Sequence, residues 1–595
     1  MDSDATAIGA PGDSARFVRA LDASELADGQ SRLVNLEGRA IALFSSAGRV
    51  FAVDNRCPHM GFPLDRGTVK DCILTCHWHH ARFDLASGGT FDQWADDARA
   101  FRVRIEDGAI WVDVAEYGDP VRRQMERLGD GLERDLPLVI AKSVIALVEG
   151  AETGPLAVFR AGLDFGVRNR RDGWGAGLTT LTCMMNLLPW LDAADRSRAL
   201  YQGIASVAED CAGNPVRFAV RPLPGAGADL ARLRGWFRQF VEVRDAEGAE
   251  RCVTSAVRSG APAREIEAMM FAAATDHRYL TTGHVLDFTN KAFEALDHAG
   301  WDRAEMVLAS LARSYAGGER MEEANAWRSP IDLVAILERA FENLPDAVHR
   351  GLTAARPWTG MEPLAAVILG DDPQSIADAM LAALSQGCAP AELGGAVAYA
   401  AALRIAHFHI SNEFGDWDTA HHSYTFANAV HQALGRAPTL ELLRGAFDAA
   451  MSVYLDRFLN VPSTKIPHRN GAARPASDLL IELPRLMDHQ QQVNQAGALV
   501  AEYLAGGGED RRLIAALASA MLREDRDFHS IQDLEAAVRQ YSYLDSYFGG
   551  TPAGNNVLIA AARYIAAHAP TARAQGQTFK IAQRFFRGDR LFEEE

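Results

Sequence analysis

Two short stretches near the start of the chain each offer one cysteine and one histidine to a common site. Cys57 is followed by His59, sixteen residues separate that histidine from Cys76, and His79 follows after two more. Both zinc and iron–sulfur clusters take two cysteines and two histidines. Zinc modules usually pair cysteine with cysteine and histidine with histidine, whereas here each stretch carries one of each. The pattern therefore favours a cluster over zinc.

The residues around these four ligands carry a family resemblance. Pro58, Gly61, Pro63, Leu64 and Gly67, and the run HHARFDLASGG that starts at His79, are similar to Rieske-type ferredoxins. The resemblance implies a [2Fe–2S] cluster with two cysteines on one iron and two histidines on the other. Its ligands in this chain are then Cys57, His59, Cys76 and His79.

The flanking residues also predict how the cluster is tuned. High-potential respiratory Rieske proteins carry a disulfide between the two loops and hydroxyl donors beside the sulfurs. In this chain Phe62 and Trp78 stand at the disulfide positions, and Ala81 and Phe83 stand where hydroxyls are expected. With fewer hydrogen-bond donors, the reduced and more negative form of the cluster is less stabilised. The resemblance thus implies a potential toward the low end of the roughly −150 to +300 mV range.

Length and composition narrow the class of protein. The chain has 595 residues, of which 48% are hydrophobic, so we expect a folded protein of several domains. Its net charge of −18 argues against nucleic acid as a partner, because phosphates would repel it. The acidic N-terminus has no apolar core typical of a signal peptide, and no stretch is apolar enough for a membrane span. The seven cysteines show no CxxC spacing, which suits a reduced, cytoplasmic protein.

The apolar pattern changes character along the chain. Residues 1–15 are predicted to be disordered, and residues 16–116 show short apolar runs separated by Gly and Asp turns, which predict a small all-β Rieske domain. Residues 117–135 are polar and read as a linker or a first surface helix. From residue 136 to 595, apolar positions recur three and four apart, which predicts a large all-α domain.

The helical part contains a faint internal repeat, near residues 260–315, 388–460 and 509–545. The first two segments begin with Ala-Pro-Ala and share the pattern His-x3-Phe-x-Asn-x5-Leu, which starts at His284 and at His422. The second copy has an insertion around ISNEFGDWDT. The third and weakest copy keeps a histidine, His529, with Glu535 six positions later.

Repeats place matching positions around a common axis, so we expect the repeat histidines to face one another. Imidazoles and carboxylates on inward-facing helices are how all-α proteins hold catalytic iron or manganese. The predicted ligands of this second site are four histidines and two carboxylates: His277, His284, His422, His529, Asp287 and Asp525. A single histidine in a helix is more often a hydrogen-bonded structural residue, and carboxylates near helix starts are often caps.

The sequence thus predicts a Rieske-dependent oxidoreductase, an oxygenase or oxidase with non-haem iron in the helical domain. Electrons would arrive from an NAD(P)H-linked flavin reductase or a ferredoxin reductase, and dioxygen would react with a small-molecule substrate. Two alternatives stay open. The helical domain can serve only to dock a partner, in an electron-transfer or redox-sensing subunit, or it can bind haem or flavin.

Overall fold

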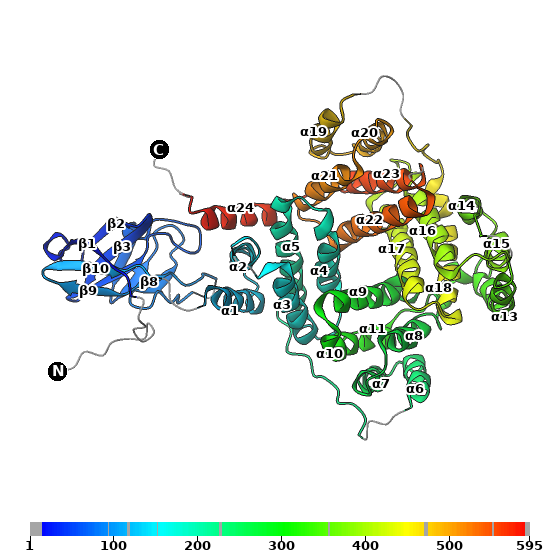
Figure 1. Cartoon of the computed structure of the whole chain (residues 1–595), viewed down its shortest axis with the longest axis horizontal. Coiled ribbons are helices and arrows are strands. Elements are labelled where there is room, and N and C mark those ends of the chain that lie inside the picture. Colours follow the sequence, from blue (N-terminus) through cyan, green and yellow to red (C-terminus); the bar gives the residue numbers. More distant parts are fainter. Residues whose placement is uncertain are drawn as a thin grey trace. The chain divides into compact units, whose positions relative to one another are not determined.

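The structure is a computed structural model that describes residues 15–92, 94–115, 119–150, 153–224, 229–354, 357–468, 474–549 and 552–589. Apart from residue 15, the segment predicted to be disordered lies outside these residues. The chain forms two compact units, one of residues 1–154 with 577–595 and one of residues 155–576. The fold class is as predicted, with a β-rich region followed by a large helical region (Figure 1).

The short apolar runs of the first unit form strands in three small antiparallel sheets, with strand orders β1-β10-β9, β2-β3-β4-β8 and β5-β6-β7. The strands are β1 (Phe17–Asp22), β2 (Ser31–Leu36), β3 (Arg39–Ser46), β4 (Arg49–Asp54), β5 (Thr68–Lys70), β6 (Ile73–Thr75), β7 (Arg82–Asp84), β8 (Ala100–Phe101), β9 (Val103–Glu106) and β10 (Ala109–Asp113).

Two-residue turns set the register of three hairpins in this unit. Glu37 and Gly38 join β2 to β3 with φ values of 53° and 80°. Ala47–Gly48 and Asp107–Gly108 repeat this pair of positive φ angles between β3 and β4 and between β9 and β10. Turns of this kind match the twist of the strands they join, and glycine at the second position relieves the steric cost.

The sheet β2-β3-β4-β8 contributes to two hydrophobic clusters, because successive side chains of a strand alternate between its faces. Phe44 and Val53 pack in one cluster with Leu74 and Phe83, residues of β6 and β7. Leu43 and Ala52 pack in the other cluster with Ile110 of β10. The first of these clusters also contains Cys57 and Cys76, so the two cysteine-bearing loops are anchored on this core.

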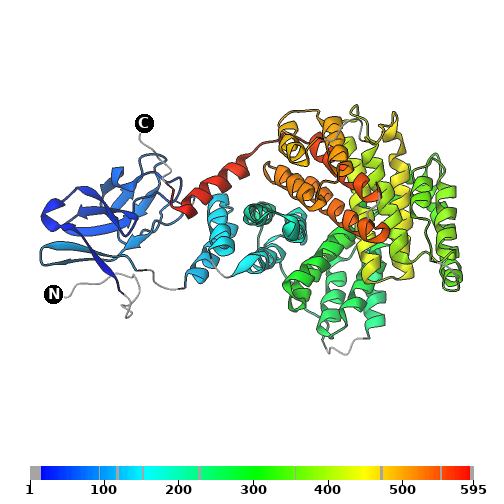
Figure 2. The ribbon, with the colours of Figure 1, turned by 45° about the horizontal axis from the view of Figure 1, so that its top comes forward.

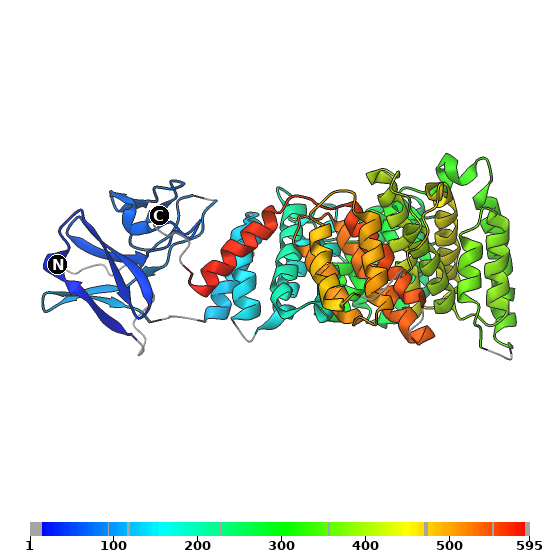
Figure 3. The ribbon, with the colours of Figure 1, turned by 90° about the horizontal axis from the view of Figure 1, so that it is seen from above.

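Helices complete the first unit. The segment 117–135, for which the sequence left a linker or a surface helix open, contains α1 (Pro120–Glu133), and α2 (Pro137–Glu149) follows. The last helix, α24 (Ala574–Arg587), returns beside α2, where Phe586 lies next to Gly150 (Figures 2 and 3). The compact unit that contains the sheets therefore also contains α1, α2 and residues 577–589.

The second unit is helical throughout its described residues, and Figure 3 shows many of its helices lying side by side. The helices are α3 (Gly154–Asn169), α4 (Ala176–Leu187), α5 (Ala193–Cys211), α6 (Leu230–Glu242), α7 (Ala246–Arg258), α8 (Ala263–Ala274), α9 (His284–Ala299), α10 (Ala304–Ala309), α11 (Ala312–Gly317), α12 (Asn325–Arg328), α13 (Leu333–Gly351), α14 (Met361–Ile368), α15 (Pro373–Ser385), α16 (Pro390–Ala406), α17 (Phe414–Arg436), α18 (Leu440–Leu455), α19 (Ala476–Leu486), α20 (Val493–Ala505), α21 (Asp510–Leu522), α22 (Phe528–Phe548) and α23 (Pro552–Ala567). Within the described ranges, no helix is long and apolar enough to cross a membrane.

Each repeat-like segment contains a pair of consecutive helices. The pairs are α8 with α9, α16 with α17, and α21 with α22. The insertion in the second copy lengthens α17 at its start, so His422 lies inside that helix, whereas His284 is the first residue of α9. Helix α17 packs against both α9 and α22, which brings the second helices of the three pairs together.

A buried ion network joins α9 to α22. Lys291 is 1% exposed, and its Nζ lies 3.0 Å from Oε2 of Glu294 and 2.6 Å from Oε2 of Glu535. Arg539 lies 2.8 Å from Glu535 and 3.3 Å from Glu294. Two cations and two carboxylates thus compensate one another in a region where an unpaired charge would be costly.

Replacing Lys291 by Met should therefore destabilise the helical unit, because an excess negative charge would stay buried. We expect a loss of about 3–5 kcal/mol in the free energy of unfolding, measured by urea denaturation followed by far-ultraviolet circular dichroism. Lys465→Met, at an exposed lysine of the same unit, is the matched control. Equal stability of the two variants would contradict the role of the network.

Candidate functional site

The two loops that carry the cysteines share one backbone design. In the first, the amide of Cys57 donates to the carbonyl of Phe62 at 2.8 Å, and the amide of Gly61 donates to the carbonyl of Cys57 at 2.7 Å. In the second, Cys76 and Ala81 form the equivalent bond at 2.9 Å, and His80 donates to Cys76 at 3.0 Å. Gly61 and His80, four positions after their cysteines, both have positive φ. Each cysteine is therefore held inside a tight turn.

The four predicted cluster ligands converge between these loops. Cys57 and Cys76 are both 1% exposed, and the ring centroids of His59 and His79 lie 4.8 Å apart. Nδ1 of His59 is buried and has no hydrogen-bond partner among the described residues. A buried nitrogen without a partner is costly, and a metal bond would satisfy it. Two thiols and two imidazoles are the donor set that a [2Fe–2S] centre of this type takes, so the residues fit the cluster.

The protonation states of this site also suit metal binding. A hydrogen bond with the Cys57 side chain lowers the pKa of Cys76 to about 6. Burial, the neighbouring His79 and Lys142 together lower the pKa of His59 to about 4. At neutral pH Cys76 and His59 thus take the forms that bind metal, whereas the hydrogen bond with Cys76 and burial raise the pKa of Cys57, whose thiol would release a proton on binding.

Aromatic rings surround the two histidines. Trp94 packs edge-on against His59, with ring centroids 4.8 Å apart, and Trp78 lies 4.3 Å from His79. Phe62 and Trp78, at the positions of the disulfide in high-potential relatives, face each other at 6.5 Å. Trp78 and Trp94 are 43% and 44% exposed. The rim of the site is therefore apolar and accessible.

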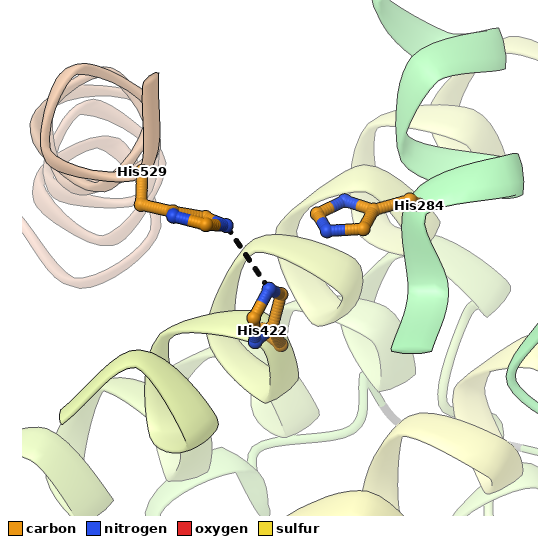
Figure 4. A group of neighbouring side chains, drawn as sticks. All are labelled: His284, His422 and His529. Carbon is orange, nitrogen blue, oxygen red and sulfur yellow. Dashed lines mark hydrogen bonds between the residues drawn. The ribbon is translucent and has the colours of Figure 1, made fainter. Parts of the chain in front are cut away.

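In the helical unit, three histidines from the three repeat-like segments meet. His284 of α9, His422 of α17 and His529 of α22 each offer a ring nitrogen, and these atoms all lie within 4.8 Å of one another (Figure 4). Nε2 of His422 lies 3.1 Å from Nε2 of His529. All three side chains are partly buried. We call these residues the histidine triad; among the described residues, it is the group that meets the geometric requirement for a metal ion.

Oxygen atoms form hydrogen bonds with two rings of the triad, those of His422 and His529, and lie near the third. Burial, followed by the neighbouring imidazoles, lowers the pKa of His422 to about 3, although a hydrogen bond with the carbonyl of Asp418 acts in the opposite direction. Nδ1 of His529 lies 3.4 Å from Asp527, and Nδ1 of His284 lies 3.8 Å from Asp287. Oxygen partners of this kind fix the tautomer and orientation of metal-binding histidines.

The segment before α9 holds His284 in place through an unusual backbone. Thr281, Thr282 and Gly283 have φ values of 49°, 51° and 92°. Two consecutive β-branched residues in the left-handed region are costly, and such conformations persist only where the surroundings determine them. Here Thr281 exchanges hydrogen bonds with Glu319, and a Cβ atom at Gly283 would lie 2.7 Å from Cβ of Phe426.

The other predicted ligands of the second metal lie elsewhere or play a different part. His277 uses both ring nitrogens, with Glu322 at 2.7 Å and Glu242 at 2.9 Å. Asp525 accepts hydrogen bonds from the amides of Ala574 and Gln575 at the start of α24. These two residues do not complete the triad, because local partners already satisfy them. Asp287 lies beside His284 and accepts a hydrogen bond from Gln532.

A buried pair beside the triad was not among the predicted site residues. His421 is 0% exposed, Asp533 is 1% exposed, and their nearest side-chain atoms lie 3.5 Å apart. Neither side chain has a hydrogen-bond partner among the described residues. Burial lowers the pKa of His421 and raises that of Asp533. His421 stands next to His422 in the sequence, but only the fold places it against Asp533.

Comparisons with known proteins concern the first unit. A family model described as Rieske [2Fe-2S] domain matches residues 16–101. The 3-phenylpropionate/cinnamic acid dioxygenase ferredoxin subunit of Photorhabdus laumondii subsp. laumondii is 36% identical over 94 residues, which are 16% of this chain and 89% of that protein. The 3-chlorobenzoate-3,4-dioxygenase oxygenase subunit of Comamonas testosteroni is 31% identical over 107 residues, 16% of this chain and 25% of its own. Apoptosis-inducing factor 3 of Homo sapiens is 30% identical over 101 residues, and the chain spans 17% of its length.

Replacing Cys76 by Ser should remove the visible absorption and the iron of the first unit, because a ligand thiolate is lost. Cys72→Ser is the matched control, since Cys72 lies four residues earlier and outside both loops. Absorption spectra, together with iron and sulfide analysis of the purified full-length variants, check the outcome. Loss of iron in both variants, or a colourless zinc-loaded wild type, would contradict the cluster assignment.

Replacing Gly283 by Ala should disturb the triad through its backbone. Alanine is strained at this φ, and its Cβ would displace Phe426, so His284 should shift. We expect cobalt(II), used as a probe, to bind at least about tenfold more weakly, which corresponds to about 1.4 kcal/mol. Gly507→Ala has a similar φ of 75° with open space around it, and it should leave cobalt binding unchanged. Equal affinities in the two variants would refute the positioning role.

Proposed function

Residues 16–101 of this chain belong to the Rieske [2Fe-2S] family, and from this premise we propose that the protein is an iron-dependent oxidoreductase, an oxygenase or oxidase. In this proposal the Rieske cluster passes electrons to a non-haem iron held by the histidine triad. The observation that carries the proposal is the convergence of His284, His422 and His529 from three repeat-related helices.

A metal ion would be a shared partner for the three imidazoles of the triad. Two Nε2 atoms 3.1 Å apart, from His422 and His529, cannot both carry protons. Burial and the neighbouring imidazoles disfavour the protonated form of His422, as its lowered pKa of about 3 shows. A proton on one of the two Nε2 atoms can form a hydrogen bond with the other, but that bond leaves His284 out, whereas a cation at the centre of the triad would accept a lone pair from all three imidazoles.

The residues around the triad favour the binding of a metal ion. Each imidazole has an oxygen atom beside one of its two nitrogens, from Asp287, Asp527 or the carbonyl of Asp418. When the proton of each ring is on that nitrogen, the other nitrogen is free to bind a metal. Phe288 and Phe528 pack against His284, with ring centroids at 5.1 Å and 5.7 Å, and provide an apolar wall that excludes water. The three histidines would hold an iron that supplies the dioxygen chemistry, and the cluster held by Cys57, His59, Cys76 and His79 would supply electrons one at a time.

The relatives support the same class of reaction. One is the ferredoxin subunit of a dioxygenase and another is the oxygenase subunit of a dioxygenase, although the match to the second covers 25% of its length. We therefore propose an NAD(P)H-linked flavin reductase or a ferredoxin reductase as the electron donor. The proposed substrates are dioxygen and a small organic molecule.

Metal analysis with and without the triad tests the proposal. After anaerobic loading with iron(II), the full-length protein should hold one iron beyond the two of the cluster, and nitric oxide added to the reduced protein should give a new electron-spin-resonance signal. His422→Ala should lose this iron and this signal but keep the Rieske spectrum. His489→Ala, at an exposed histidine of the same unit, should keep both.

Two outcomes would overturn the proposal. Wild-type protein without iron beyond the cluster would favour the alternative of an electron-transfer or redox-sensing subunit. An additional iron that persists in His422→Ala would place the metal away from the triad.

A further inference from the structure

A buried lysine contacts the first cluster-binding loop from outside the Rieske domain. Lys142 lies on α2, and its Nζ donates a hydrogen bond to the carbonyl of Pro58, the residue between Cys57 and His59. The side chain of Lys142 is 10% exposed. Its Nζ lies 4.5 Å from the ring centroid of Phe585 of α24, so an aromatic ring covers the charge.

The charges around this lysine leave the loop with a positive surplus. Asp96 lies 3.5 Å from Lys142, but the same carboxylate also forms an ion pair with Arg127 of α1. One carboxylate therefore serves two cations. Arg134, the residue after α1, donates to the carbonyl of Ala95 at 3.0 Å and pairs with Asp130 at 3.5 Å. Arg56 beside the loop is paired with Asp54 at 3.3 Å.

The same contacts fix the wall beside His59. Trp94 packs on the His59 ring. Arg134, the residue after α1, bonds the carbonyl of the next residue, Ala95. Arg127 of α1 and Lys142 of α2 both pair with Asp96. The helices thus attach to the cluster site at two points, through the carbonyl of Pro58 and through segment 94–96. The side chains that make these attachments, Arg127, Arg134 and Lys142, lie outside residues 16–101, which make up the family match.

A positive charge at this place affects electron transfer directly. The reduced cluster carries one more negative charge than the oxidised cluster, so a nearby cation stabilises the reduced form. Burial strengthens the effect, because solvent and salt screen a buried charge less than an exposed one. Hydroxyl donors do not supply this stabilisation here, since Ala81 and Phe83 are buried at the positions where high-potential relatives carry them.

We propose that Lys142 is a positioning residue of the Rieske centre, which holds a buried positive charge on the Cys57–His59 loop and raises the reduction potential of the cluster. Asp96 acts in the opposite direction and orients Lys142 toward the loop. The inference depends on the cluster in the first unit, and it is independent of any metal at the histidine triad.

Redox titration of the full-length protein at pH 7, followed by the electron-spin-resonance signal of the reduced cluster, tests the proposal. Lys142→Met should lower the equilibrium constant for one-electron reduction by about tenfold, which is about 59 mV. Lys142→Arg should stay near wild type because the charge is kept. Asp96→Asn should raise the potential, since a negative charge is removed; this variant and wild type are also titrated at pH 6, so that Lys142 keeps its proton without Asp96, which stabilises its charged form. Lys70→Met, at an exposed lysine of β5, should leave the potential unchanged.

The opposite signs expected for Lys142→Met and Asp96→Asn separate a charge effect from structural damage. A merely structural role would predict shifts of the same sign, or a loss of cluster, in both variants. If Lys142→Met does not assemble the cluster, the other two variants decide the question. Lys142→Arg should assemble the cluster with a potential near wild type, and the potential of Asp96→Asn should rise. A potential of Lys142→Met within a few millivolts of wild type, or a fall of potential in Asp96→Asn, would overturn the proposal. Failure of the triad to bind iron would leave this titration unaffected, so the two proposals can fail separately.

Discussion

The helical unit depends on the cost of burying polar groups along its central helices. Helix α17 packs against α9 and α22, and the interfaces contain lysine, carboxylates, amides and imidazoles in addition to apolar side chains. A buried charge or amide is costly without a partner, and this arrangement of the helices supplies partners for most of them, with His421 and Asp533 as exceptions among the described residues. The Lys291 network between α9 and α22 is the strongest of these constraints, because neither carboxylate can be buried there without a cation.

The repeat explains why the polar groups occur in layers. The histidines of the triad form one layer, and the residues six positions later form a second one, about 9 Å further along each helix. These residues are Asn290, Asn428 and Glu535. Asn290 bonds Glu294, Asn428 accepts from Gln540, and Glu535 pairs with Lys291. All three residues of the second layer have internal partners, although Oδ1 of Asn290 is buried without one among the described residues, whereas the triad layer offers nitrogen atoms that face one another. Under the proposed function, the second layer stabilises the fold and the triad layer binds the metal ion.

The first unit shows a comparable division of labour. Two loops of the same backbone design present the cluster ligands, and the hydrophobic cluster beneath them anchors both cysteines. Helices outside the family match then add a charge, an ion pair and an aromatic cover around Pro58. The Rieske scaffold thus determines which cofactor fits, while the added helices alter the electrostatic environment in which that cofactor would work.

The sequence by itself determined the parts of this protein that depend on local spacing. The cluster ligands could be assigned because each Cys–His pair lies within one tight loop: Cys57 with His59, and Cys76 with His79. The triad could be predicted because equivalent residues of a repeat occupy equivalent positions in the fold: His284, His422 and His529. The tertiary structure decided which neighbours join them. His277 and Asp525 resembled ligands, but Glu322 and the start of α24 satisfy them. Lys142 is 84 residues from Pro58, and His421 is 112 residues from Asp533. Contacts at such separations follow from helix packing and charge compensation, which leave no periodic signal in the sequence.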